Sequence, residues 1–474
     1  MARGGLPVGL SIDSPIPASA MSPTPALPAT ATRRNDLDWL RVLAFALLIL
    51  YHTGLVFVGW KFHIMSHITS PALELPMEFL NQWRMPLLFV ISGVGVTFAL
   101  SRRTAGLFAG ERAQRLLLPL IFGMCVVVVP QVYYQRLSEG AHYTSLFDFY
   151  PHYFNGAAPK GNFTWNHLWF IAYLLVFSLL SLPLFVQLRK PAAQAALARL
   201  GQWLNRPGAV LLFALPLIII QLTLRPYWPD TRNLVHDWFN FAFYLTLFLY
   251  GYLLGPLAGF WQAAERQRYL LLALGLAAFF FYYWGDDYYY ALIGGAIKRV
   301  VQAFNCWCWI LVCVGFGRRY LNRNSPLLQR ANEAVFPFYI LHQTVLIVLG
   351  YYVLQWNATN AAKFLITALG TFGFTLLLYL VIQRFSVLRV LFGLKPLRAK
   401  ATADSPPPGP PGQRGAPGLR RVRPRPASAG PAAEEQLASW PPRGQRVALA
   451  LKPRTYGPGQ RWPSCWRTSV GRFP

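Results

Sequence analysis

Long apolar runs separated by short polar loops fill the chain from residue 38 to residue 384. Each run is close to the ~20 residues that cross a bilayer as a helix. Outside this block the apolar runs stop. The pattern predicts an all-α, polytopic membrane protein with ten transmembrane helices, at residues 38–58, 79–100, 115–135, 167–188, 209–225, 236–256, 269–285, 296–316, 334–354 and 363–384.

The basic residues of the loops indicate how these helices are oriented in the membrane. Alternate loops are rich in Arg and Lys, and the loops between them contain at most two basic residues each. Because basic loops are retained in the cytoplasm, the pattern predicts that both termini are cytoplasmic. It also predicts a multi-pass membrane protein. The basic loops carry Arg102, Arg103, Arg112 and Arg115; Arg189, Lys190, Arg199 and Arg206; Arg266 and Arg268; and Arg318, Arg319, Arg323 and Arg330.

The two ends of the chain differ in composition from the apolar block. Residues 1–34 are rich in Pro, Ala, Ser and Thr and lack the apolar core of a signal peptide, which predicts a disordered cytoplasmic leader. Residues 396–474 are basic and rich in Pro and Gly. That composition is typical of a disordered tail, and a reading-frame error would also produce it. The transmembrane domain is therefore predicted at residues 35–395.

Charge and cysteine content exclude two classes of function. The chain is 54% hydrophobic and carries a formal charge of +27. In a soluble protein such a charge suggests nucleic acid. Here the basic residues lie in short loops and in the tail, which indicates membrane topology and anionic lipid instead. Cys306 and Cys308 point to different helix faces, and no ring of His or Cys accompanies them, so no metal site is predicted.

The first apolar run contains ionisable residues that need an explanation. Arg41 and His52 are eleven residues apart, so they share a helix face, with His52 about 16 Å deeper in the membrane. Asp38 is placed to pair with Arg41. A second histidine, His342, lies about eight residues into the ninth run. Two intramembrane histidines facing one cavity would suit proton transfer. The alternative is that Arg41 snorkels to head groups and each histidine is a satisfied polar residue between helices.

Two further sets of residues lie at helix ends. Arg112 and Arg115 share a helix face at the cytoplasmic end of the third run. Paired guanidinium groups suit phosphate recognition, whereas ordinary positive-inside flanking is the alternative. His167 and Trp169 begin the fourth run on the outer side. They are candidates for substrate binding, or else part of the interfacial aromatic belt.

Five short motifs in order resemble the acyltransferase-3 family of integral membrane acyltransferases. They are DWLR followed after ten residues by His, MPLLFVISG, FAGERAQRLLLP, HLWFIAYLL and FPFYILH. The resemblance covers about residues 35–395 and is strongest to the glucan-modifying branch of the family. It implies acyl transfer from a cytoplasmic acyl-CoA to an acceptor on the far side of the membrane, with succinylation of periplasmic glucans in that branch.

The resemblance also implies roles for the residues singled out above. His52 is the candidate catalytic base or transient acyl carrier, and Arg41 matches the basic residue paired with it. Arg112 and Arg115 match an Arg pair near the phosphates of CoA. His342 and His167 match recurring positions with a less defined role. Some members carry an appended SGNH-type domain that this chain lacks, which implies that it acts alone or with a separate partner.

These observations predict a membrane O-acyltransferase that moves an acetyl or succinyl group from acyl-CoA to a hydroxyl of an extracytoplasmic glycan, with no bound cofactor. A thioester is already activated, so the protein has mainly to position it, deprotonate the acceptor and stabilise an oxyanion. A succinyl group would need a further cation, for which Lys298 or Arg299 is a candidate. The alternatives are a secondary transporter or flippase with an intramembrane His and Arg pathway, and a non-catalytic partner in polysaccharide export.

Overall fold

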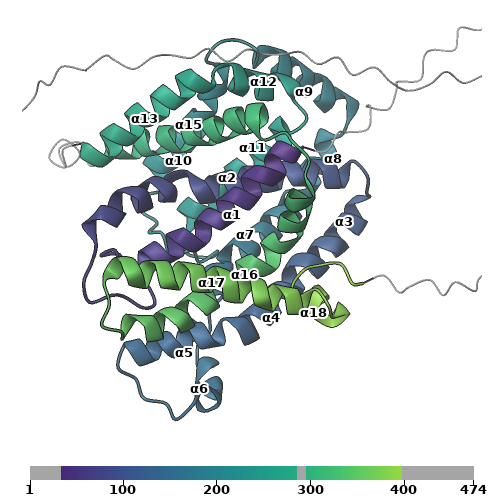
Figure 1. Ribbon diagram of the computed structural model, residues 1–474. Coiled ribbons are helices and arrows are strands. Elements are labelled where there is room, and N and C mark those ends of the chain that lie inside the picture. Colours follow the sequence, from purple (N-terminus) through teal and green to yellow (C-terminus); the bar gives the residue numbers. More distant parts are fainter. Residues whose placement is uncertain (1–33, 286–294, 398–474) are drawn as a thin grey trace, which may run out of the picture. The chain divides into compact units, whose positions relative to one another are not determined.

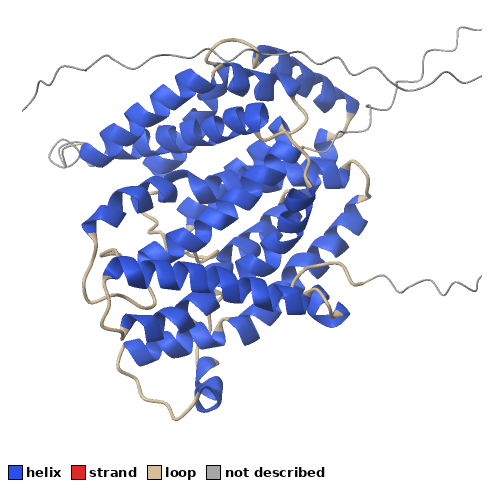
Figure 2. Ribbon diagram, viewed as in Figure 1, coloured by secondary structure: helices blue, strands red, loops and turns tan. Residues whose placement is uncertain are grey.

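The computed structural model describes residues 34–285 and 295–397 of the chain. The predicted leader and tail lie almost entirely outside the described residues. Within them the regular structure is helical and contains no β-strand (Figure 2). The predicted all-α class is therefore confirmed.

One helix, α1 (Asn35–Leu55), lies against four others (Figure 1). It packs on α2 (Glu74–Leu100), α15 (Ala296–Tyr320), α16 (Pro326–Leu354) and α17 (Asn360–Ile382). Carboxylates in its first turn complement the positive end of the helix dipole. Buried side chains recur at intervals of three or four, which is the spacing of one helix face; they include Leu37, Leu40, Ala44, Leu48 and Tyr51.

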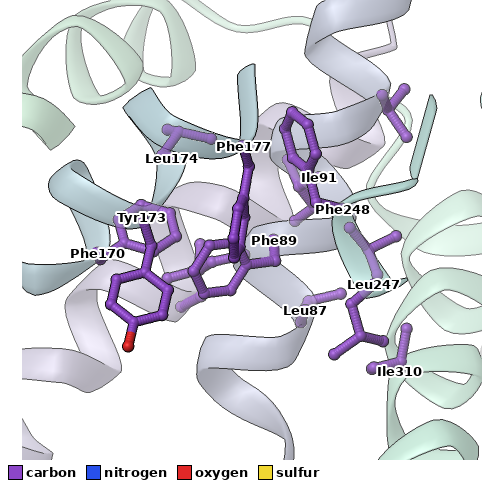
Figure 3. Close-up of a cluster of buried hydrophobic side chains, with 14 of the residues drawn as sticks. Leu87, Phe89, Ile91, Phe170, Tyr173, Leu174, Phe177, Leu247, Phe248 and Ile310 are labelled. Carbon is purple, nitrogen blue, oxygen red and sulfur yellow. The ribbon is translucent and has the colours of Figure 1, made fainter. Parts of the chain in front are cut away.

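Helix α2 approaches α11 (Trp238–Leu254) closely enough for the two backbones to touch. Gly93 of α2 lies against Gly251 of α11, and a methyl group added at Gly93 would lie 3.0 Å from the Cα of Gly251. Glycine pairs of this kind let membrane helices pack at short range. Figure 3 shows the adjoining apolar cluster, in which Phe89 of α2 lies with Phe170 and Phe177 of α7 (Trp169–Leu180).

The third predicted apolar run forms a continuous but uneven helix over Ala105–Ser138. Two stretches are wound as π-helix, each shortly before a proline. Pro119 and Pro130 have no backbone N–H, so the α-helical hydrogen bonds to the carbonyls four residues earlier cannot form. The segments are α3 (Ala105–Arg112), η2 (Ala113–Leu117), α4 (Leu118–Phe122), η3 (Gly123–Val127) and α5 (Val129–Ser138).

Two other predicted runs are bent helix pairs. Helix α7 is followed by α8 (Leu182–Leu188) at 48°, and α11 is followed by α12 (Ala258–Arg266) at 106°. Pro183 stands in the first turn of α8 and Pro256 stands between α11 and α12. Proline disfavours helical backbone in the residue before it and breaks the hydrogen-bond ladder.

All ten predicted runs coincide with helical segments. By length and composition, six single helices among the described residues can cross a membrane, and up to eight spans result if each bent pair counts as one. The other two runs correspond to shorter apolar helices, Ala209–Thr223 and Arg268–Trp284. A membrane protein with several spans is thus established, while ten spans remain a prediction. The remaining elements are η1 (Pro71–Leu73), α6 (Leu146–Tyr153), η4 (Asn166–Leu168), α9 (Pro191–Trp203), η5 (Ala209–Phe213), α10 (Ala214–Thr223), α13 (Arg268–Trp284) and α18 (Ser386–Leu391).

Candidate active site

The two predicted intramembrane histidines face each other. His52, near the C-terminal end of α1, places its Nδ1 2.9 Å from Nε2 of His342 on α16. Their rings lie nearly parallel, with centroids 5.1 Å apart. His342 is 1% exposed, whereas His52 is only partly buried. Packing of α1 on α16 therefore places one accessible imidazole in front of one buried imidazole.

The hydrogen bonds of His342 determine which nitrogen of His52 can act as a base. Nδ1 of His342 lies 2.8 Å from the carbonyl oxygen of Tyr339, one turn earlier in α16. A carbonyl only accepts, so this nitrogen carries the proton, and Nε2 of the neutral ring is an acceptor. Nδ1 of His52 then donates to it, and the lone pair of His52 lies on Nε2. A nucleophile or base oriented by a buried partner is the general arrangement of catalytic side chains.

His167 lies beside this pair, but both of its nitrogens are engaged within the protein. Its Nε2 donates to the carbonyl of Ile340 at 3.1 Å, and its Nδ1 accepts from the amide of Gln131 at 3.3 Å. The same amide donates to Thr344, and the hydroxyl of Tyr339 donates to the carbonyl of His167. His167 therefore holds η4 and α5 against α16.

Two adjoining cavities meet at His52. The histidine cavity, about 120 Å³, is lined by Leu48, Tyr51, His52, Arg84 and Met85 among others. The loop cavity, about 460 Å³, is lined largely by the segments around residues 60–63 and 164–169. Both are lined by Tyr51, His52, Asn81, His167, Trp169 and Arg232. The two predicted substrate-binding residues, His167 and Trp169, thus border the space in front of His52.

The loop cavity is polar and aromatic. Its wall includes the indoles of Trp60, Trp165 and Trp169. It also includes His63, whose Nδ1 lies 2.5 Å from the side-chain oxygen of Gln135. Burial lowers the pKa of His63 below its ordinary value, so this imidazole is neutral at pH 7. The wall therefore offers hydrogen-bond donors and acceptors without net charge from His63.

The predicted arginines gather in a separate cavity. Arg41, Arg112 and Arg115 line the arginine cavity, which measures about 290 Å³. Arg41 also bonds to Asp38 and to Asn332 of α16, at 3.3 and 3.1 Å. The structure thus groups Arg41 with the Arg pair of the third helix and separates it from His52 by three turns of α1. Three guanidinium groups around one cavity form a site suited to an anion such as phosphate.

A thin layer of side chains separates the arginine cavity from the histidine cavity. Phe45 of α1 and Leu88 of α2 line the arginine cavity, whereas Leu48 of α1 and Met85 of α2 line the histidine cavity. Residues three apart in a helix differ in height by about 4.5 Å. The ring of Tyr339 contacts Phe45 and Phe170 in this layer, at centroid distances of 5.5 and 5.9 Å.

Arg84 is the residue of this site that the sequence interpretation missed. It lies on α2, is 3% exposed and lines the histidine cavity. Its guanidinium lies 3.8 Å over the ring of Tyr51, next to His52. An Arg inside an apolar run was the available signal, because charges within membrane helices are rare and functional by default. By contrast, Lys298 lies over the ring of Tyr282, and neither Lys298 nor Arg299 is among the described residues that line the histidine cavity.

The described residues contain no group of three or more His, Cys, Asp or Glu able to hold a metal ion. The cysteines among them, Cys125, Cys306, Cys308 and Cys313, are free thiols. The groups that the site brings together are imidazoles and guanidiniums, and Nε2 of His52 is the candidate base.

Comparison with known proteins assigns the chain to a family. Residues 34–380 match the family model described as an acyltransferase domain of the acyltransferase-3 type. The chain is 24% identical over 395 residues to the glucans biosynthesis protein C of Escherichia coli strain K12, a match that covers 80% of this chain and 99% of that protein. The protein of the same name from Escherichia coli O81 (strain ED1a) matches to the same extent. No solved structure matches the chain. Because the family model spans most of the sequence, the chain belongs to the acyltransferase-3 family and is a membrane acyltransferase.

Proposed function

We propose that the protein transfers a short acyl group from acyl-CoA, bound at the arginine cavity, to a hydroxyl of a glycan bound at the loop cavity. His52 is the catalytic base, or the transient acyl carrier, at the point between them. The observation that carries the proposal is the His52–His342 pair, in which His52 lines the loop cavity and lies one side-chain layer from the arginine cavity.

The donor site follows from charge. Acyl-CoA carries phosphates at one end and a neutral thioester at the other. Arg112 and Arg115, with Arg41, would hold the phosphates, and the thioester arm would extend along Phe45 and Leu88 toward His52. This arrangement explains why the arginines and the histidines of the site lie at different depths.

The acceptor site follows from the wall of the loop cavity. Sugars combine apolar faces, which pack on aromatic rings, with hydroxyls, which bond to amides and imidazoles. Trp60 and Trp165 supply the rings, and Gln135, Asn166 and Gln343 supply amides. A cavity of about this size is typical of a small-molecule site, and its polar and aromatic wall suits a sugar.

The chemical step is a base-assisted attack on the thioester. Nε2 of His52 takes the proton of the acceptor hydroxyl, and the hydroxyl oxygen bonds to the carbonyl carbon. The C–S bond then breaks, and the CoA thiolate leaves and takes up the proton from His52. His342 keeps its own proton on Nδ1 and holds the ring of His52 in the reactive tautomer. General-base action of this kind contributes roughly 10²–10⁴-fold in rate.

The proposed topology has ten spans, both termini in the cytoplasm and a location in the bacterial inner membrane. The basic loops favour a cytoplasmic position for the start of α1, and with it for the arginine cavity. The loop cavity then opens toward the periplasm. The donor and the acceptor are thus proposed to approach from the sides where each would be available.

The test is transfer of radiolabelled acyl groups in purified membranes, with acetyl-CoA and succinyl-CoA as parallel donors. We expect label in the glycan fraction with the wild type, and none with His52→Ala or Arg115→Ala. The control His67→Ala removes an exposed histidine of the loop that follows α1 and should transfer normally. Rapid denaturation in ionic detergent at neutral pH, without acceptor, distinguishes the two roles of His52, because an acyl carrier retains label on the protein.

Full transfer by His52→Ala at normal membrane levels would overturn the mechanism. Absence of His52-dependent label from either donor would favour a transporter or flippase, in which the buried His and Arg residues serve a proton or substrate pathway. Normal glycan modification in cells that carry His52→Ala would instead favour a non-catalytic partner in polysaccharide export.

A further inference from the structure

An apolar groove lies between three membrane helices. It measures about 590 Å³ and is lined by residues of α1, α16 and α17, each of which is long and apolar enough to cross a bilayer. Its wall includes Phe45 of α1, Phe338 of α16 and Leu376 of α17. Three wall residues of α17, Phe372, Leu376 and Leu380, are exposed apolar side chains. The groove therefore opens to the surroundings of the helices, which in a bilayer are hydrocarbon.

The groove is about as long as one leaflet of a bilayer is deep. Its lining extends from Phe372 to Gln383 along α17 and from Leu327 to Phe338 along α16. Each range covers a rise of about 16 Å along the helix, which is close to half of the ~30 Å hydrocarbon core. Leu327 lies in the first turn of α16, and Gln383 directly follows α17. One end of the groove therefore lies at a membrane surface, where a lipid chain would enter it.

The groove becomes polar at that end. The charged residues among its described lining are Arg330 and Glu333. Glu333 pairs with Arg389 at 2.8 Å, whereas the side chain of Arg330 is exposed. The amide of Gln383 lies at the same end. The described mouth of the groove thus has two guanidinium groups against one carboxylate, and this excess of positive charge is complementary to a phosphate.

The groove shares part of its wall with the arginine cavity. Phe45 of α1 and Val335 of α16 line both. Phe45 also belongs to the side-chain layer, where its ring packs against Tyr339 with centroids 5.5 Å apart. A chain that fills the groove therefore packs against residues that border the arginine cavity on their other side.

We propose that this groove binds an anionic phospholipid, with one acyl chain along α16 between α1 and α17 and the phosphate at Arg330. The apolar wall accounts for the chain. Arg accounts for the phosphate, because its planar fork bonds two phosphate oxygens at once. In the proposed topology the lipid belongs to the cytoplasmic leaflet, whose anionic headgroups attract basic residues near the membrane. Lipid binding goes beyond the proposed function and does not depend on acyl transfer.

The experiment titrates two lipids with identical chains, dioleoylphosphatidylglycerol and dioleoylphosphatidylcholine, into the protein in detergent and follows the melting midpoint. We expect the anionic lipid to stabilise the wild type at a lower concentration than the zwitterionic lipid. Arg330→Gln should weaken the apparent affinity for phosphatidylglycerol about fivefold, the equivalent of about 1 kcal/mol for one basic residue near an anionic surface. Its response to phosphatidylcholine should not change. Arg199→Gln is the control, because Arg199 is an exposed arginine of α9 that does not line the groove.

Filling the groove tests the position of the chain. Leu376→Trp on α17 and Ala46→Leu on α1 enlarge two lining side chains and should reduce stabilisation by both lipids. Leu369→Trp should behave as the wild type, because Leu369 is 71% exposed on α17 and does not line the groove. Native mass spectrometry of the wild type purified from membranes should show one retained anionic phospholipid, which the two groove-filling variants lose. An equal response of the wild type to the two lipids would overturn the inference, and so would an unchanged response in both groove-filling variants.

Discussion

At the scale of single residues, His52 and His342 differ in burial and in their hydrogen bonds. His342 is buried and bonds to the carbonyl of Tyr339, so its proton position is determined by the helix that carries it. His52 borders two cavities and bonds to His342 through Nδ1, which leaves Nε2 as its basic nitrogen. An imidazole oriented by a second group through one nitrogen and reactive at the other is the logic of catalytic triads. Here a second histidine takes the position that a carboxylate has in those triads.

Replacing the buried histidine should lower turnover more than it lowers donor affinity. In His342→Phe, the ring of His52 loses the acceptor that selects its tautomer, and we expect kcat to fall roughly 100-fold or more, within the range of general-base effects. The KM for acyl-CoA should change little, because the arginine cavity is untouched. Steady-state transfer rates check this, with His67→Phe as the matched control. An unchanged kcat in His342→Phe would show that His342 only packs the helices.

At the scale of the helices, three helices carry the site, and each supplies residues both near the arginine cavity and near the histidine cavity. Helix α1 supplies Arg41 and His52, α16 supplies Asn332 and His342, and α2 supplies residues on both sides of the side-chain layer. A sliding movement of α2 by one turn, about 5.4 Å, would carry Leu88 toward the height at which Met85 now lines the histidine cavity. The close glycine contact of α2 with α11 resists such a movement, because the backbones interlock there.

A methyl group at that contact should destabilise the protein. In Gly251→Ala the new Cβ would meet the carbonyl oxygen of Val90 and lie 2.9 Å from the Cα of Gly93, and backbone atoms cannot rotate away. Overpacking of this kind costs about 1–3 kcal/mol or more, so the melting midpoint in detergent should fall clearly. Gly373→Ala on α17 is the control, because no described atom of a neighbouring residue lies within 4 Å of its added methyl group. Equal midpoints for the two variants would refute the close contact.

At the scale of the whole molecule, the described residues surround the arginine cavity and, beyond a thin layer of side chains, the adjoining histidine and loop cavities. The arginine cavity and the loop cavity are lined by residues that extend from Arg41 in α1 to Gly393. Residues 34–380 match the family model, and residues 401–474 lie outside the described part of the chain. The described lining of both cavities thus ends before residue 396, where the basic Pro/Gly-rich sequence begins.

Removing residues 401–474 should therefore leave acyl transfer unchanged. Both cavities keep every described lining residue in such a truncation, so neither donor affinity nor turnover has a reason to change. Transfer rates in membranes, normalised to the amount of protein inserted, check the expectation. A matched truncation after Ile382 removes Gly393 from the arginine cavity and should impair donor binding. A loss of transfer in the first truncation at normal membrane levels would show that the tail is a working module.

The class of the protein and most of its candidate functional residues could be predicted from the amino-acid sequence. Apolar runs of bilayer length predict membrane helices because unsatisfied backbone groups are excluded from hydrocarbon. Ionisable residues within such runs stand out for the same reason, which is how Arg41, His52 and His342 were found. The order of the five motifs along the chain also indicated the family.

Which of these residues lie together could not be predicted without the packing of the helices. Arg41 and His52 share one face of a single helix. Helix packing nevertheless places Arg41 at the arginine cavity and His52 against His342, 290 residues later in the chain. Arg84 could be located within its run, yet its lack of a hydrogen-bond partner among the described residues appears only when the neighbouring helices are in place. Periodicity depends on near neighbours along the chain. Cavities and buried charges depend on contacts between distant segments, and those contacts arise only when the helices pack.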